Sequence, residues 1–280
     1  MRFGTTFRIY GLTFDVEALK QKIDYQAPQG QAQNTPWITV YNDSDQYQMV
    51  QAEFQKAHVD YHAREFVEYT KAETENAPYY ELKLICPFQG QDKVSATDFG
   101  VEYRYSCDCC KRHSRILEQT SPMTLDLKKI GKWQMFTAPP EFIVREDVKQ
   151  IIEQAGLSGI QFRPVLDYKN RDLESTHCQI FVDHILPPMS KYTIQSDGGS
   201  LPCKKCGSTA IYLENPITYT RKDLENAKDF NLSQEHIFNY GMRVLVISKR
   251  ARDIIKGAVR RCNPVPILVE DGGVVRPSFG

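Results

Sequence analysis

Alternation of apolar and polar residues predicts short strands along the N-terminal part of the chain. The alternating stretches before the first cysteine pair are residues 3–10, 37–41, 79–86 and 99–105. Helical patterns are fewer here. Residues 15–23 predict a short helix, and the polar segment 44–69, with its scattered aromatic residues, predicts a longer one. Residues 26–33 are rich in Gln, with Pro and Gly, and predict a loop.

A pattern of strand, helix and strand occurs twice in the second part of the chain. The first copy comprises residues 142–144, 148–155 and 160–165, and the second comprises residues 245–247, 251–259 and 265–269. The helix faces superpose with a constant offset of 103 positions, which pairs Val148 with Ala251 and Ile152 with Ile255. Ser248 is a candidate N-cap in the second copy. Shared order and spacing predict a tandem duplication, and the alternative is a common pattern that occurs twice by chance.

Two C-x-x-C pairs, Cys107/Cys110 and Cys203/Cys206, carry the strongest chemical signal. Because 203 − 107 and 206 − 110 both equal 96, the pairs keep one offset, and each pair precedes one copy of the repeated pattern. Four thiolates in two tight turns suit one tetrahedral zinc ion. All four cysteines are therefore predicted metal ligands. A closed set of four sulfurs leaves no position for water, so the predicted zinc is structural rather than catalytic.

The two cysteine pairs differ in their flanking residues. Gly207 follows the second pair, and Lys111 stands at the equivalent place after the first. This position often needs a positive φ, which glycine adopts most easily. Cys109 and His113 lie close to the first pair in the sequence, and either could substitute for one of its ligands. The first pair is therefore the less regular of the two.

The predicted fold class is α+β with mixed sheets. In this prediction, two duplicated strand-helix-strand halves are joined by a four-cysteine zinc knuckle pair. The predicted division is an α/β extension over residues 1–80, a first half over 81–175 and a second half over 176–280.

Charge and composition limit the classes of partner. The 280 residues contain 35 Lys and Arg against 35 Asp and Glu, so the chain lacks the basic excess that attracts nucleic acid. No apolar run approaches the roughly 20 residues that span a bilayer. The N-terminal residues do not resemble a signal peptide. We therefore expect a cytoplasmic protein with neither a membrane nor nucleic acid as its partner.

Other chemistry finds less support in the sequence. A C-x-x-C can be a redox dithiol when it opens a helix, but no helical pattern starts at Cys107 or Cys203. His58 and His62 have i, i+4 spacing on the predicted helix, but Val59 follows His58, so the H-E-x-x-H motif is missing. No phosphate-loop, dinucleotide-binding or nucleophile-elbow motif occurs. We therefore expect a protein that is not an enzyme.

The two knuckles and the repeated segments resemble the double-CxxCG motif family of bacterial proteins. The resemblance covers roughly residues 80–270. It is most specific at Cys107, Cys110, Cys203, Cys206 and Gly207, and Lys111 departs from the motif. Some members of this family are immunity proteins that protect a cell from a toxin delivered by its kin. The strand-helix-strand segments also look like those of other immunity proteins in polymorphic-toxin systems.

The resemblance implies a zinc-stabilised, non-catalytic protein that binds and neutralises a cognate toxin. Two alternatives remain open. One is a zinc-ribbon-like nucleic-acid or transcription adaptor, although compact ribbons hold their C-x-x-C pairs about 15–20 residues apart. The other is a C-x-x-C oxidoreductase.

Overall fold

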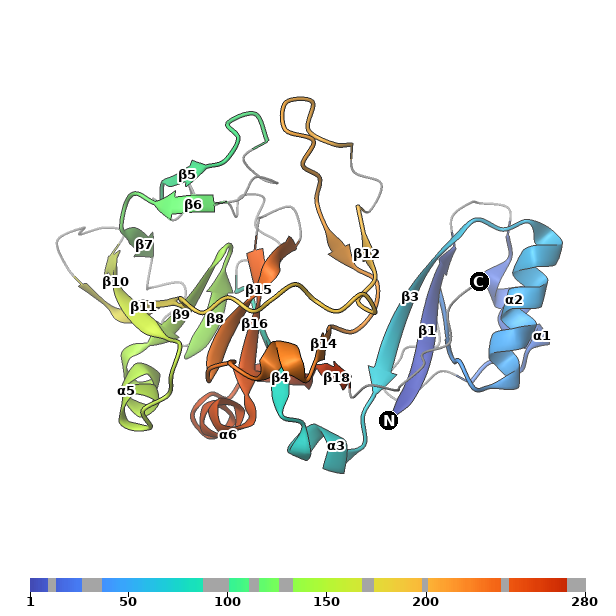
Figure 1. The fold of residues 1–280 in the computed structure, drawn as a ribbon. Coiled ribbons are helices and arrows are strands. Elements are labelled where there is room, and N and C mark those ends of the chain that lie inside the picture. Colours follow the sequence, from blue (N-terminus) through green and yellow to red (C-terminus); the bar gives the residue numbers. More distant parts are fainter. Residues whose placement is uncertain are drawn as a thin grey trace. The chain divides into compact units, whose positions relative to one another are not determined.

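The chain is a mixed α+β protein with several sheets and few helices, as the sequence predicts (Figure 1). The computed structural model describes residues 1–9, 14–26, 37–87, 101–110, 116–125, 133–167, 174–197, 201–237 and 242–270. The chain divides into two compact units. The first comprises Met1–Glu75 and Glu214–Pro216, and the second comprises Asn76–Leu213 and Ile217–Gly280. The predicted division at residue 175 stays a prediction.

The first unit is a three-stranded antiparallel sheet in the order β2-β1-β3, with two helices against one face. Its elements are β1 (Arg2–Ile9), α1 (Val16–Lys22), β2 (Trp37–Tyr41), α2 (Asp45–Ala57) and β3 (Tyr61–Glu68). Both helices begin at a capping side chain. Asp15 accepts a hydrogen bond from the backbone N–H of Ala18, and Ser44 accepts one from Tyr47. The core between helices and sheet consists of Phe7, Leu19, Ile23, Ile38, Val40, Val50 and Phe54.

The prediction of one helix over residues 44–69 is wrong in its second half. Helix α2 ends at Ala57, His58 adopts φ 49°, and the chain returns as β3. No Gly or Pro marks this reversal. In addition, β3 is mostly exposed or half-buried, so it lacks the strict apolar alternation that indicates a strand.

The second unit contains two larger sheets. One has five strands in the order β7-β10-β11-β9-β8, and the other has four in the order β15-β16-β4-β17. The elements of the first are β7 (Met123–Leu125), β8 (Met135–Ala138), β9 (Glu141–Arg145), α5 (Glu146–Gln154), β10 (Gln161–Asp167) and β11 (Glu174–Phe181). Those of the second are β4 (Tyr79–Leu84), β15 (Phe230–Ile237), β16 (Met242–Ser248), α6 (Lys249–Ala258) and β17 (Cys262–Pro266).

Short elements complete the second unit. They are β5 (Tyr103–Tyr105), β6 (Ile116–Gln119), β12 (Gln195–Ser196), β13 (Tyr212–Leu213), β14 (Thr218–Thr220), the 3-10 helix η2 (Lys222–Leu224) and β18 (Leu268–Glu270). Helix α3 (Lys71–Asn76) belongs to the first unit except for its last residue. Strands β5 and β6 form a hairpin, β12 pairs with β13, and β14 pairs with β18. The predicted last strand, residues 265–269, is therefore divided between β17 and β18.

Both predicted strand-helix-strand segments are present, and each contains an inserted strand. Strands β9 and β10 flank β11 and run antiparallel to it, and β16 and β17 flank β4 in the same way. The inserted strands come from different places, since β11 follows β10 in the chain whereas β4 precedes β16 by a long distance. The arrangement therefore does not confirm that the halves are duplicated copies.

Alternating residues on the strands separate the cores of the second unit. Val144 and Ile180 face a core shared with α5 and α6, which pack beside each other (Figure 1). Ile143 faces a second core, formed by Val101, Met123, Leu125, Phe136, Ala138, Ile143 and Val165. Tyr103 of β5 packs against this second core. The core therefore anchors the hairpin that leads into the first cysteine pair.

Candidate metal centre

The first cysteine turn lies at the end of the β5–β6 hairpin. Cys107 follows two residues after β5, and its side chain is buried at 5% exposure. Residues 107–110 form a bend and a turn, and β6 brings the chain back. Because β5 is anchored on the second core, Cys107 is held close to packed structure.

The second cysteine turn lies between β12 and β13, which contribute only two residues each. Two backbone hydrogen bonds close it. The N–H of Gly207 donates to the carbonyl of Cys203 at 2.7 Å, and the N–H of Cys203 donates to the carbonyl of Ser208 at 2.8 Å. Gly207 has φ 70°, so glycine occupies the left-handed conformation that the sequence predicts for it.

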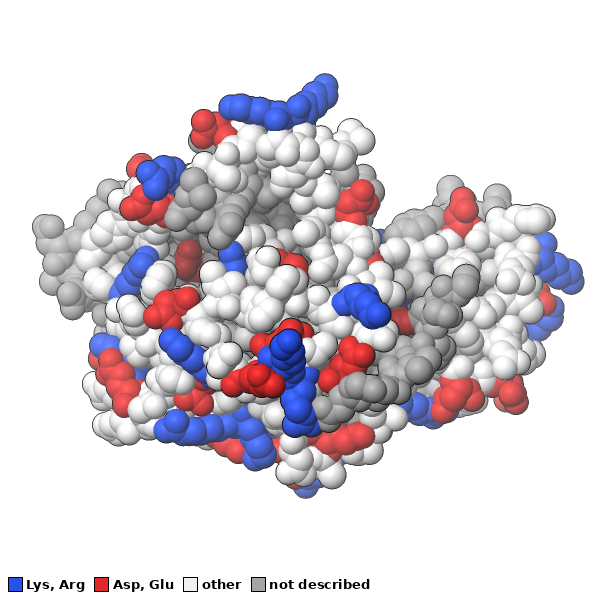
Figure 2. Space-filling model, in the orientation of Figure 1, with Lys and Arg blue, Asp and Glu red and all other residues white. Residues whose placement is uncertain are grey.

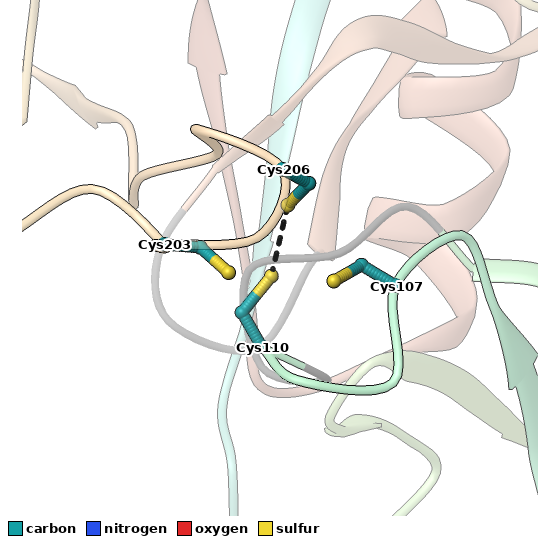
Figure 3. Close-up of side chains that lie close together, drawn as sticks. All are labelled: Cys107, Cys110, Cys203 and Cys206. Atoms are coloured by element: carbon teal, nitrogen blue, oxygen red, sulfur yellow. Dashed lines mark hydrogen bonds between the residues drawn. The ribbon is translucent and has the colours of Figure 1, made fainter.

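The two turns bring their four thiols together. The Sγ atoms of Cys107, Cys110, Cys203 and Cys206 all lie within 4.8 Å of one another. Figure 3 shows the sulfurs converging from two loops, with Cys110 and Cys206 3.3 Å apart. Four sulfurs at about 2.3 Å from a tetrahedral zinc ion would be separated by roughly 3.8 Å, so the cluster has the size of such a site. The predicted clustering of these four residues is confirmed, and the arrangement is compatible with a structural metal.

In both turns, backbone amides favour the thiolate form of the first cysteine of the pair, which is Cys107 in one turn and Cys203 in the other. The N–H groups of Cys206 and Lys205 donate to Cys203 and lower its pKa to about 6. Those of Cys110 and Cys109 lower the pKa of Cys107 in the same way. A cysteine binds a metal as its thiolate, so both turns are preorganised for ligation.

Of the three flanking residues that make the first pair less regular, Lys111 and His113 lie outside the described residues. The third, Cys109, is exposed and does not belong to the four-cysteine cluster. Its pKa is raised, chiefly because its thiol hydrogen-bonds to Cys203. Within the described residues, Cys109 is therefore a neighbour of the cluster rather than a member.

The proposed histidine pair does not share a helix face. His58 caps α2, whereas His62 belongs to β3 and forms an ion-pair contact of 2.9 Å with Glu214. The i, i+4 spacing therefore has no structural meaning here. His177 is buried, with Nε2 3.0 Å from the carbonyl oxygen of Trp133 and Nδ1 3.2 Å from the hydroxyl of Thr176.

A polar network near the hairpin gave no signal in the sequence. Tyr103 of β5, Glu141 of β9 and Gln179 of β11 are joined by hydrogen bonds. Their sequence positions are far apart, and Glu141 begins a strand whose central residues are apolar. The pairing of β9 with β11 brings Glu141 and Gln179 together, and the packing of β5 on the second core adds Tyr103. No local pattern predicts either contact.

The charged side chains of the described residues are mixed in sign. Figure 2 shows blue and red groups interspersed over the visible face rather than one broad basic patch. None of the helices in the described ranges has the length and apolar content needed to cross a bilayer.

No protein-family model matches the chain, and the search of curated proteins finds no similar sequence. Membership of the double-CxxCG family therefore stays a prediction.

Proposed function

We propose that Cys107, Cys110, Cys203 and Cys206 hold one zinc ion and that the protein is a non-catalytic immunity protein, which binds and neutralises a cognate bacterial toxin. The observation that carries the metal part is the convergence of four thiols from two loops. The toxin part rests on the resemblance of the knuckles and repeated segments to the double-CxxCG family.

Zinc is the metal that this ligand set favours. A tetrahedral set of four sulfurs is typical of structural zinc sites, and thiolates neutralise the charge of the ion. The ion would join two turns separated by 96 positions. Cytoplasm is the proposed compartment, because reducing conditions there keep the thiols available for metal.

A duplicated origin of the two strand-helix-strand segments belongs to the same proposal. Both α5 and α6 follow the second strand of a hairpin, and both segments enclose one antiparallel strand. The paired core residues Val148 and Ala251, and likewise Ile152 and Ile255, are buried against a shared core. In this proposal the zinc ion joins the turns that precede the two copies.

Two features favour binding over redox catalysis. Residues 107–110 and 203–206 lie in turns rather than at the first turn of a helix. The 3.3 Å thiol contact is between Cys110 and Cys206, which belong to different motifs. A dithiol catalyst would instead bring together the two cysteines of one motif.

The mixed surface charge favours a protein partner over a nucleic acid. Nucleic-acid affinity depends on basic surfaces that neutralise phosphates, and the described face in Figure 2 carries both signs. No binding to DNA or RNA at low salt is expected. Steeply salt-dependent binding would support the adaptor alternative instead.

Co-expression with a toxin tests the function. The genes beside this one are first searched for a secreted toxin, which is then produced in cells with or without the wild-type chain; a neighbourhood without such a gene would count against the toxin part. We expect the wild type to restore growth and to bind the purified toxin at one-to-one stoichiometry. Zinc-loaded protein that neither binds this toxin nor restores growth would contradict the toxin part and leave the metal part intact.

A further inference from the structure

An open groove of about 640 Å³ lies in the second unit beside the β5–β6 hairpin. The hairpin contributes Tyr103 and Glu118, and the five-stranded sheet contributes Glu141, Arg163 and Gln179. Its opposite wall comes from β15 and β16. The volume is within the range of natural ligand sites. None of the four cysteines lines the groove.

The floor of the groove is a fixed hydrogen-bond network. Tyr103 donates to Oε1 of Glu141 at 2.7 Å, and Nε2 of Gln179 donates to Oε2 of Glu141 at 2.6 Å. The same Nε2 donates to Gln119 at 2.8 Å. Both hydrogens of the Gln179 amide are used, so its orientation is determined. Its Oε1 has no partner among the described residues, although Gln179 is only 1% exposed.

Arg163 offers a cationic edge to the groove. Its guanidinium lies over the ring of Phe181, 3.8 Å from the ring centre. Within the described residues it makes no hydrogen bond or ion pair. Stacking occupies the face of the guanidinium and leaves the N–H groups at its edge, which match the two oxygens of a carboxylate.

The acidic groups of the groove are already compensated. Glu118 pairs with Arg104 at 3.0 Å, and Asp183 accepts a hydrogen bond from Gln161 at 3.3 Å and lies 3.9 Å from Lys228. Both oxygens of Glu141 accept hydrogen bonds from neighbouring side chains.

Burial raises the pKa of Glu141, and the hydrogen bonds from Tyr103 and Gln179 and the nearby charge of Arg163 oppose that rise. Arg243, on the other wall, donates to the carbonyl of Ser233 and contacts His236. The groove therefore has two guanidinium groups, and each of its acidic side chains already has a hydrogen-bond or ion-pair partner. Ile185, which is 45% exposed, adds an apolar surface beside them.

We propose that this groove binds a carboxylate carried on a short apolar stem, and that the N–H groups at the edge of the Arg163 guanidinium bind its two oxygens. The ring of Phe181 stacks on the guanidinium and holds it in position. Arg243 adds attraction from the other wall, and Ile185 contacts the stem. The carboxylate belongs either to a free small acid or to an acidic side chain of a bound polypeptide. The inference is independent of the toxin and of the zinc ion.

Titration calorimetry with two probes tests the proposal at low ionic strength. The first probe is glutarate, and the second is the blocked tripeptide acetyl-Gly-Glu-Gly-amide. The protein is the full chain with its bound metal, and both probes are titrated to concentrations on the order of 10 mM, since weak single-group ligands bind in the millimolar range. Binding of glutarate alone assigns the groove to a small acid, and binding of the peptide assigns it to a side chain.

Variants distinguish a bidentate contact with Arg163 from non-specific electrostatic attraction. Arg163→Gln should weaken binding at least about tenfold, because it removes a charge-assisted bidentate contact. Arg163→Lys should recover only part of the affinity, since an ammonium keeps the charge without the planar fork. Arg64→Gln, an exposed arginine that does not line the groove, is the matched control and should leave affinity unchanged.

Two results would overturn the proposal. One is that neither probe binds the wild type. The other is that Arg163→Gln binds as tightly as the wild type while circular dichroism shows that the variant is folded.

Discussion

The two cysteine turns share a motif but differ in what supports them. The first is joined to β5, which is anchored on a packed core, and Cys107 is 5% exposed. The second stands between two strands of two residues each, Cys206 is exposed, and the neighbouring Leu201 is 89% exposed. The same four-residue motif can therefore be positioned by core packing or, in our proposal, by a bound metal. We expect the second turn to depend more on the ion.

Loss of one ligand should have the largest effect. Cys203→Ser should abolish stoichiometric zinc and lower the melting temperature of the second unit by on the order of 10 °C, because binding energy at a structural site is folding energy. Metal analysis and thermal melting measure both. Cys109→Ser is the control, since Cys109 lies outside the cluster and should keep its zinc. Equal melting temperatures for Cys203→Ser and the wild type would show that the turns are not joined by metal.

Chelation should distinguish the two turns directly. Removal of zinc is expected to raise backbone hydrogen exchange more over residues 203–208 than over residues 101–107, because only the latter segment contains a strand, β5, that packs on the second core. Mass spectrometry of exchange with and without chelator gives the comparison. Equal increases in the two segments would contradict the claim that core packing holds the first turn and the metal holds the second.

Replacing Gly207 should change the free energy of unfolding by a smaller amount than losing a cysteine ligand. Gly207→Ala places a side chain at φ 70° without any atom within 4 Å of the new Cβ, so the cost is conformational, roughly 1 kcal/mol. The matched control is Gly257→Ala within α6, which also meets no atom within 4 Å. Its helical position predicts a gain of roughly 0.5–1 kcal/mol. Denaturant unfolding of the zinc-loaded protein should therefore show opposite signs, and equal signs would contradict the turn geometry.

Much of the local structure was predictable, because it depends on residues close in sequence. Ser248 caps α6 through the N–H of Ala251, as the sequence predicts, and Gly156, with φ 58°, follows the end of α5. The clustering of four cysteines followed from their common spacing. The helix predicted over 44–69 is wrong in its second half, because β3 is exposed or half-buried and lacks a strict apolar alternation.

Long-range pairing could not be predicted. Strand β4 lies between β16 and β17, more than 150 positions before them in the chain, and no local pattern indicates that choice. The Tyr103–Glu141–Gln179 network depends on such pairing and was missed for the same reason.

The pH dependence of stability should test a buried histidine, His177, that is not part of the cysteine cluster. Burial lowers the pKa of His177, and this effect outweighs the hydrogen bond to the carbonyl of Trp133, which raises the pKa. The unfolded chain, with a histidine pKa of about 6.5, therefore binds more protons. This contribution to stability is present above about pH 6.5 and is lost as pH falls through the lowered pKa of the folded state.

Urea unfolding between about pH 7 and pH 5 measures this contribution. His177→Gln should flatten the pH dependence relative to the wild type, whatever its absolute stability. Identical slopes in the two proteins would show that His177 does not carry the effect. The change is expected to be the smallest of the series, because one side chain titrates.

X-ray absorption at the zinc edge tests the central claim most directly. Protein purified under reducing conditions without added metal should contain about one zinc per chain, with four sulfur neighbours at about 2.3 Å. A first shell that contains nitrogen or oxygen, or purified protein that contains no zinc, would contradict the four-cysteine site.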